Sequence, residues 1–162
     1  MSPIIITAAH PKDTASARRF SVETGMFEHE ESVEVEQQLL AVIHGHDPGT
    51  VLTAKNGDEV VGAGYVAPEP CSDRCWNLYF LVVDRDQHGL GIGTLIVAEV
   101  EQRLRDLGPT RARVLLIETS STDQYVNTRA FYKARGYTQE ATVRYYYGPG
   151  DHKVIFWKQL QT

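Results

Sequence analysis

Cysteine is scarce in this chain, which has only Cys71 and Cys75 among its 162 residues. The two thiols could form one disulfide if oxidised, but without nearby partner ligands they do not form a zinc site. A chain of this length buries a substantial core without disulfides or metals. We therefore expect two reduced thiols and no metal site.

Long apolar runs and clusters of basic residues are also missing. No segment approaches the length of a membrane span, and the apolar run in residues 1–6 is too short for a signal peptide and lacks a basic leader. These absences predict a cytoplasmic protein with no membrane partner. Because 16 Lys and Arg face 21 Asp and Glu, for a net charge of −5, no broad positive charge attracts nucleic acid.

Apolar periodicity and turn residues divide the chain into helices and strands. We expect strands at residues 4–8, 50–54, 59–66, 76–83, 113–118, 138–147 and 153–159. We expect helices at residues 14–23, 33–44 and 92–107, and a short helix that ends at 134. Ala15, Phe20 and Val22 should face partly inward on the first helix, and Leu95 belongs to the apolar stripe of the third.

This order predicts the α/β (α+β) class. We expect a single domain over residues 1–162, with a mixed, mostly antiparallel central sheet of about six or seven strands and helices on both faces. The 42% hydrophobic and 23% charged content is ordinary for such a globular domain.

The most informative segment is the glycine loop at residues 88–94. The apolar run at 78–83 is typical of a buried strand, and Gly89, Gly91 and Gly93 then open a helix. Glycine lets the phosphates of a ligand lie against the backbone, and the N–H groups at a helix start favour negative charge. The pattern predicts a phosphate-binding loop.

Three kinds of ligand compete for this loop. A nucleotide P-loop requires a lysine before the Ser/Thr, and no lysine precedes Thr94. A dinucleotide fold needs a glycine or alanine where Thr94 stands, and a βαβ unit where this chain has a hairpin. Its ribose-binding acid would be Glu118, which lies later than the usual spacing of about 20 residues. The third ligand is an acyl-coenzyme A.

Residues 88–93 and 131–137 carry two motifs that resemble those of the GNAT superfamily of N-acetyltransferases. The first matches the coenzyme A signature Arg/Gln-x-x-Gly-x-Gly/Ala, except that His88 stands where Arg or Gln is usual. The second matches an aromatic-Tyr pair followed by three residues and Gly-aromatic. The element order also matches, so the resemblance covers essentially the whole chain. Residues 24–27, 118–121 and 147–151 are similar to an uncharacterised bacterial branch of the superfamily.

The resemblance implies how acetyl-CoA is held. Backbone groups of the strand would pair with pantetheine, and N–H groups of the loop would hold the pyrophosphate. The asparagine usual in the second motif is replaced by Tyr125, with Asn127 nearby. The expected cofactor-binding residues are Leu81, Val82, Val83, His88, Gly89, Leu90, Gly91, Ile92, Gly93, Thr94 and Asn127.

The resemblance also implies catalytic roles. Tyr132 is expected to be the general acid, because a phenol with a pKa near 10 keeps its proton at neutral pH and can give it to the departing thiolate. From its place at the end of a strand beside the expected cleft, Glu118 is expected to be the base that takes the proton of the amine, directly or through water, and Asp73 and His88 are remoter candidates. Alternatively, Glu118 only fixes the following loop through hydrogen bonds to Ser120 or Thr122.

The sequence therefore predicts an acetyl-CoA-dependent N-acetyltransferase that acts directly on a primary amine, either a small molecule or a protein amino group. A homodimer is common in the superfamily. The alternatives are a catalytically silent acyl-CoA-binding or sensor protein and, from the loop alone, a dinucleotide enzyme.

Overall fold

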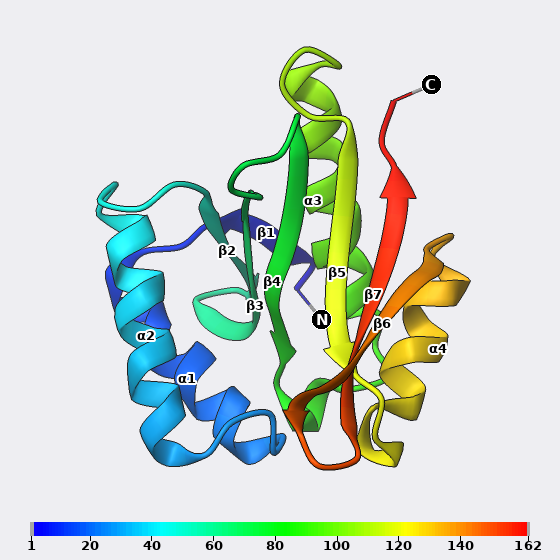
Figure 1. Ribbon diagram of the computed structural model, residues 1–162. Coiled ribbons are helices and arrows are strands. Elements are labelled where there is room, and N and C mark those ends of the chain that lie inside the picture. The colour runs from blue at the N-terminus through cyan, green and yellow to red at the C-terminus, as the bar shows by residue number, and fades with distance from the viewer. Residues whose placement is uncertain (1, 162) are drawn as a thin grey trace. The chain divides into compact units, whose positions relative to one another are not determined.

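A computed structural model describes residues 2–161 and contains one sheet of seven strands in the order β1-β2-β3-β4-β5-β7-β6 (Figure 1). The strands are β1 (Ile4–Ala8), β2 (Thr50–Asn56), β3 (Glu59–Pro68), β4 (Cys75–Val83), β5 (Val114–Ser120), β6 (Thr138–Gly148) and β7 (Asp151–Gln159). The helices are α1 (Thr14–Glu23), α2 (His29–Ile43), α3 (Ile92–Leu107) and α4 (Val126–Ala134). The predicted α/β class and strand number are confirmed.

Strand pairing is mostly antiparallel, as predicted. β1 with β2, β2 with β3, β5 with β7, and β6 with β7 all pair antiparallel, whereas β4 and β5 run parallel. The described residues form two compact units, one of residues 2–67 and 80–102 and the other of residues 68–79 and 103–161. A single domain over residues 1–162 stays a prediction.

The first unit buries its sheet between helices. One face carries Ala63, Phe80 and Val82, which pack with α1 and α2 residues such as Phe20 and Leu39 in one apolar cluster. α1 and α2 lie side by side (Figure 1). The neighbouring residue of β3 faces the other way, because successive strand residues alternate between faces. There, a Cβ added to Gly62 would lie 3.0 Å from Ile96 Cδ1, so α3 packs closely on this second face.

The second unit centres on β5 and β7. Leu115, Ile117, Val154 and Phe156 are at most 3% exposed and form one buried face of these strands. Their cross-strand register pairs Ile117 with Phe156. α4 covers this face, since the Tyr132 ring lies 5.6 Å from the Phe156 ring, centroid to centroid.

Two helix expectations were wrong in detail. α2 begins at His29, four residues before the predicted start, because Glu28 and Glu31 form a reciprocal capping box there. The exposed fractions also correct the inward faces: Ala15 is exposed, Val22 is 37% exposed and Leu95 is 43% exposed. Only Phe20 of the three residues named on the first helix is buried.

Two smaller features follow from the described residues. Cys71 and Cys75 are free thiols, as predicted. Within residues 2–161, no helix is long and apolar enough to cross a membrane.

Candidate active site

The glycine loop between β4 and α3 is held at both ends within the first unit. At its start, the Asp84 N–H donates to a carbonyl of β3 at 2.9 Å, and the His88 ring donates from Nε2 to the Val83 carbonyl at 2.9 Å. At its end, the Leu95 N–H donates to the Gly91 carbonyl at 3.1 Å, within the first turn of α3. The shape of the loop is therefore set without a ligand.

Gly89 and Gly91 give the loop its open form. Their φ angles are +82° and +81°, a left-handed conformation that glycine adopts without strain. A Cβ built on either residue would meet no heavy atom within 4 Å, so the space beside both is open. Since the first N–H groups of a helix have no intrahelical acceptor, the loop and the start of α3 fit an anionic group such as a diphosphate.

The predicted cofactor-binding residues 81–83 and 88–94 all lie within the segment 81–94 of the first unit. Val82 is buried in the core, whereas Leu81 and Val83 on either side are half-buried. Leu90 is 60% exposed. Because few of these side chains are polar, a ligand here would be held chiefly by backbone groups. Asn127 lies apart in the sequence, exposed on α4 of the second unit.

Tyr132 is buried inside the second unit, with 4% of its surface exposed. Its ring contacts those of Phe131, Tyr137 and Phe156 at centroid distances of 5.4, 6.1 and 5.6 Å. Desolvation by this burial raises the pKa of Tyr132 well above its ordinary value. The phenol therefore keeps its proton throughout the neutral range.

Glu118 of the same unit lies in a polar network on β5. Its Oε1 accepts from Asn77 Nδ2 at 3.1 Å, and its Oε2 pairs with Lys153 Nζ at 3.0 Å. Lys153 in turn lies 3.5 Å from the centroid of the Tyr146 ring. The Lys153 side chain is 12% exposed, and hydrogen bonds to Tyr146 and Glu118 outweigh its desolvation and raise its pKa. Lys153 is a fixed positive charge beside the carboxylate.

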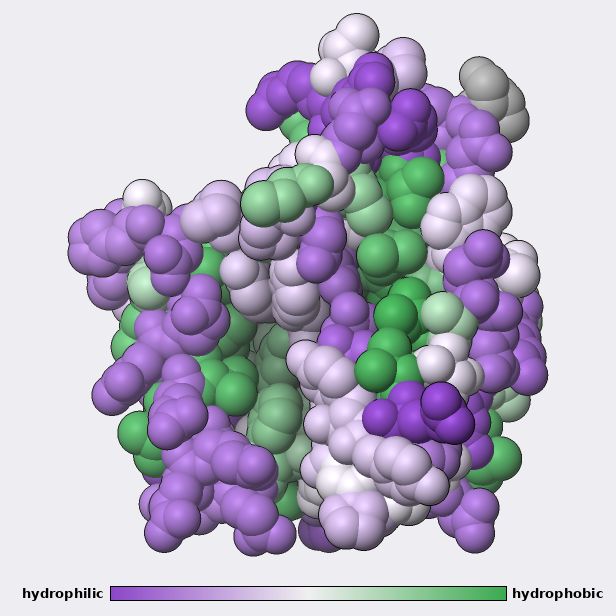
Figure 2. Space-filling model, viewed as in Figure 1, coloured by the Kyte–Doolittle hydropathy of each residue, from purple (hydrophilic) through white to green (hydrophobic). Residues whose placement is uncertain are grey.

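Glu118 and Tyr132 lie on opposite faces of the second unit's strands. Tyr132 packs on Phe156, which stands directly opposite Ile117 in the β5–β7 ladder. Glu118 is the next residue along β5, so it points to the other face. That face also carries half-buried apolar residues of β5 and β7, seen as a hydrophobic strip in Figure 2. The half-buried residues of this face of β5 and β7 are Val114, Leu116, Ile155 and Trp157.

The alternative role of Glu118, fixing the loop after β5, is filled by other side chains. Ser120 Oγ donates to Asp151 Oδ1 at 2.5 Å and accepts from the Thr122 N–H at 3.1 Å. Arg129 Nη1 donates to the carbonyls of Ser120 and Thr122, both at 2.8 Å. The hydrogen bonds of Glu118 go to Asn77 and Lys153 instead.

Sequence reasoning missed three members of this network: Glu69, Lys153 and the side chain of Asn77. Asn77 is fully buried on β4, and its Nδ2 also donates to Glu69 Oε2 at 3.1 Å. Glu69 and Asn77 lie eight residues apart, Lys153 is far from both in the sequence, and no local motif marks the three. Only the pairing of β4 with β5 and of β5 with β7 brings them to Glu118.

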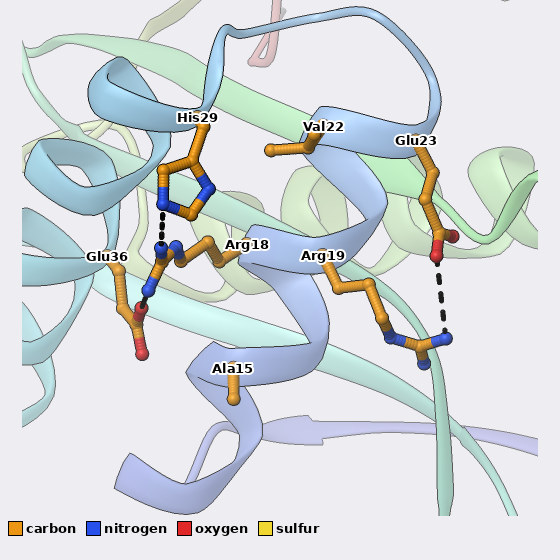
Figure 3. A pocket seen from close by; sticks show the side chains of 7 residues that line it. All are labelled: Ala15, Arg18, Arg19, Val22, Glu23, His29 and Glu36. Carbon is orange, nitrogen blue, oxygen red and sulfur yellow. Dashed lines mark hydrogen bonds and ion pairs between the residues drawn. The ribbon is translucent and has the colours of Figure 1, made fainter.

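A separate groove of about 410 Å³ lies between α1 and α2 (Figure 3). Its charges are already paired: Arg18 contacts Glu36 at 3.2 Å and His29 at 3.3 Å, and Arg19 contacts Glu23 at 3.8 Å. This groove presents no unpaired charge to recognise a ligand. Within residues 2–161, no group of three or more His, Cys, Asp or Glu side chains is arranged to hold a metal ion.

Comparison with known proteins agrees with this geometry. The model of the acetyltransferase (GNAT) family matches residues 15–137. A protein assigned to the GNAT family from Desulfovibrio desulfuricans is 28% identical, with a TM-score of 0.86, and the match covers 98% of this chain and 100% of the other. No curated protein matches the sequence.

Two more distant structures share the fold alone. An aminoglycoside 6'-N-acetyltransferase complexed with coenzyme A is 18% identical, with a TM-score of 0.77 and 98% of each chain covered. The ribosomal-protein-S18-alanine N-acetyltransferase of Escherichia coli is 12% identical, with a TM-score of 0.76 over 99% of this chain and 96% of the other.

Proposed function

The chain belongs to the acetyltransferase (GNAT) family and is an acetyl-CoA-dependent N-acetyltransferase; we propose that it acetylates a primary amine directly, with Tyr132 as general acid and Glu118 as base. The observation that carries the proposal is the glycine loop. Gly89 and Gly91 hold it open in left-handed conformations at the start of α3.

The loop residues fit the diphosphate of acetyl-CoA. The positions beside Gly89 and Gly91 are open, and the backbone donors at the start of α3 face no intrahelical acceptor. Residues 88–94 would hold the diphosphate, and Leu81, Val82 and Val83 would offer backbone groups to pantetheine. When bound, acetyl-CoA supplies the acetyl group as an activated thioester.

The two proposed catalytic groups serve different atoms. Glu118 takes a proton from the nitrogen of the acceptor amine, which must be neutral to attack. Tyr132 Oη gives a proton to the leaving sulfur. The raised pKa of Tyr132 keeps the phenol protonated until that step. The amine nitrogen and the leaving sulfur are bonded to the same acetyl carbon during the transfer. With Glu118 and Tyr132 on opposite faces of β5 and β7, we propose that Tyr132 acts directly and that Glu118 takes the proton through water.

The proposed acceptor is a small-molecule amine or a protein amino group. Both classes occur among the structural neighbours, whose names give an aminoglycoside and an alanine of a ribosomal protein. A homodimer and a cytoplasmic location stay predictions.

The proposal is tested by release of free thiol from acetyl-CoA in the presence of a panel of primary amines. Tyr132→Phe should lower kcat about a hundred-fold or more and leave the Kd of acetyl-CoA unchanged. Tyr137→Phe is the matched control, because it removes a hydroxyl from the same aromatic cluster. Equal kcat in wild type and Tyr132→Phe would refute the acid role. Binding of acetyl-CoA without thiol release from any amine would favour the silent binding protein instead.

A further inference from the structure

We propose that Glu69 and Glu118 together form a two-carboxylate acceptor site that selects amines carrying a second positive charge. The inference rests on the proposed function, since it assigns Glu118 to the reacting amine. It adds Glu69 as a specificity residue and Asn77 as a positioning residue. All three belong to the second unit.

Asn77 joins the two carboxylates through one nitrogen. Its Nδ2 donates to Glu69 Oε2 and to Glu118 Oε1, each at 3.1 Å. The two oxygens are therefore at most about 6.2 Å apart, because both lie at that distance from the same atom. Two like charges held this close repel each other unless a cation lies between or beside them.

The buried amide is oriented for this contact at a cost. Asn77 is 0% exposed, and its Oδ1 has no hydrogen-bond partner. A buried polar atom without a partner destabilises the folded state, so its presence requires a reason. Turning the amide over would point Oδ1 at two carboxylates. The observed orientation therefore serves the two carboxylates rather than the stability of the Asn77 side chain.

The two carboxylates differ in charge balance. Glu118 is neutralised by Lys153 at 3.0 Å. Glu69 accepts only from neutral donors, namely Asn77 Nδ2 at 3.1 Å and the Tyr79 hydroxyl at 2.5 Å. No Lys or Arg among residues 2–161 lies within ion-pair distance of Glu69, so its negative charge is uncompensated.

The surroundings of Glu69 suit an ammonium group. Tyr79 is 43% exposed and its hydroxyl donates to Glu69 Oε2, so the carboxylate lies beside a side chain that reaches the surface. The reacting nitrogen gives its proton to Glu118 and attacks as the free amine, while the second nitrogen stays protonated beside Glu69. The substrate class is then a diamine or polyamine, or an aminated molecule with a second ammonium a few bonds from the first.

The test compares butane-1,4-diamine with butylamine, which has the same carbon chain and lacks the second charge. Wild type should use the diamine with a kcat/KM at least ten-fold higher. In Glu69→Gln, this ratio should fall to near one through a higher KM for the diamine. Glu140→Gln, which removes an exposed carboxylate of β6, is the matched control and should keep the wild-type ratio.

Asn77→Leu separates positioning from a structural role. It removes the buried unpartnered oxygen and also the Nδ2 donor of both carboxylates, two changes with opposite effects on the melting temperature, while the KM for the diamine should increase as in Glu69→Gln. A lower melting temperature with equal losses of kcat on both amines would make Asn77 purely structural and overturn its role. Titration calorimetry of butane-1,4-diamine against wild type and Glu69→Gln gives a second readout, independent of turnover.

The outcomes distinguish the two proposals. Turnover of butylamine without any preference for the diamine, and equal calorimetric affinities in wild type and Glu69→Gln, would overturn the two-carboxylate site and leave the acetyltransferase proposal standing. Tighter diamine binding by wild type with no thiol release from either amine would support the site while refuting the proposed reaction.

Discussion

Replacing Gly91 by alanine separates backbone strain from ligand binding. The φ of Gly91 is +81°, and a Cβ there would meet no heavy atom within 4 Å. The substitution therefore adds no clash and costs only the left-handed conformation, about 1–2 kcal/mol for a residue with a Cβ. Alanine also restricts the unfolded chain, which returns about 0.4–1 kcal/mol. The net loss of folding free energy should be about 1 kcal/mol.

Gly57→Ala is the matched control for this prediction. Gly57 lies in the turn between β2 and β3 at φ +61°, and a Cβ there also meets nothing within 4 Å. Both variants should therefore lower the melting temperature by about 2–4 °C, the shift expected per kcal/mol for a chain of this size. Scanning calorimetry measures the two shifts side by side.

Binding of acetyl-CoA should distinguish the two variants. The Cβ of Gly91→Ala occupies the open space beside the loop backbone, which keeps the diphosphate from a loop N–H group. Loss of one hydrogen bond to a charged group costs about 1.5–3 kcal/mol, which raises the Kd at least ten-fold. Gly57→Ala should bind as wild type does. The reasoning fails if Gly91→Ala keeps the wild-type Kd, or if both glycine variants weaken binding equally.

Three further predictions follow from other features. Lys55→Met leaves the buried Asp13 carboxylate without its partner at 3.1 Å, and should lower the free energy of unfolding by about 3 kcal/mol in urea titrations. Burial raises the pKa of Tyr132, so the folded state keeps a proton that the unfolded state loses near pH 10. Stability should be unaffected below that pH and fall by about 1.4 kcal/mol per pH unit above it, and urea titrations should show a shallower fall in Tyr132→Phe. Light scattering should give a dimer mass of twice 18.2 kDa; a monomeric wild type would refute the dimer.

Local sequence patterns predicted most elements of the fold, because the signals that start and stop an element lie within it. β1 has the predicted bounds, as do α1 and α3. Inward faces were harder to predict, since an apolar residue on a helix edge is not always covered. Leu95 continued the stripe of Ile92 and Ile96, yet its side chain is 43% exposed. Val97, two residues further along the helix, is buried instead.

The two halves of the site differ in how far the sequence reveals them. The loop at residues 88–94 is one continuous stretch of sequence. Its glycines indicate a left-handed backbone conformation without knowledge of the rest of the fold. The network around Glu118 depends on strand register, which no single segment contains. Lys153 reaches Glu118 only because the β5–β7 ladder pairs Ser120 with Lys153 and Glu118 with Ile155. A one-residue slip of β7 would move Lys153 to the buried face and leave Glu118 without its cation. The charge balance that separates Glu118 from Glu69 is thus a property of the assembled sheet, and so is the acceptor preference that we derive from it.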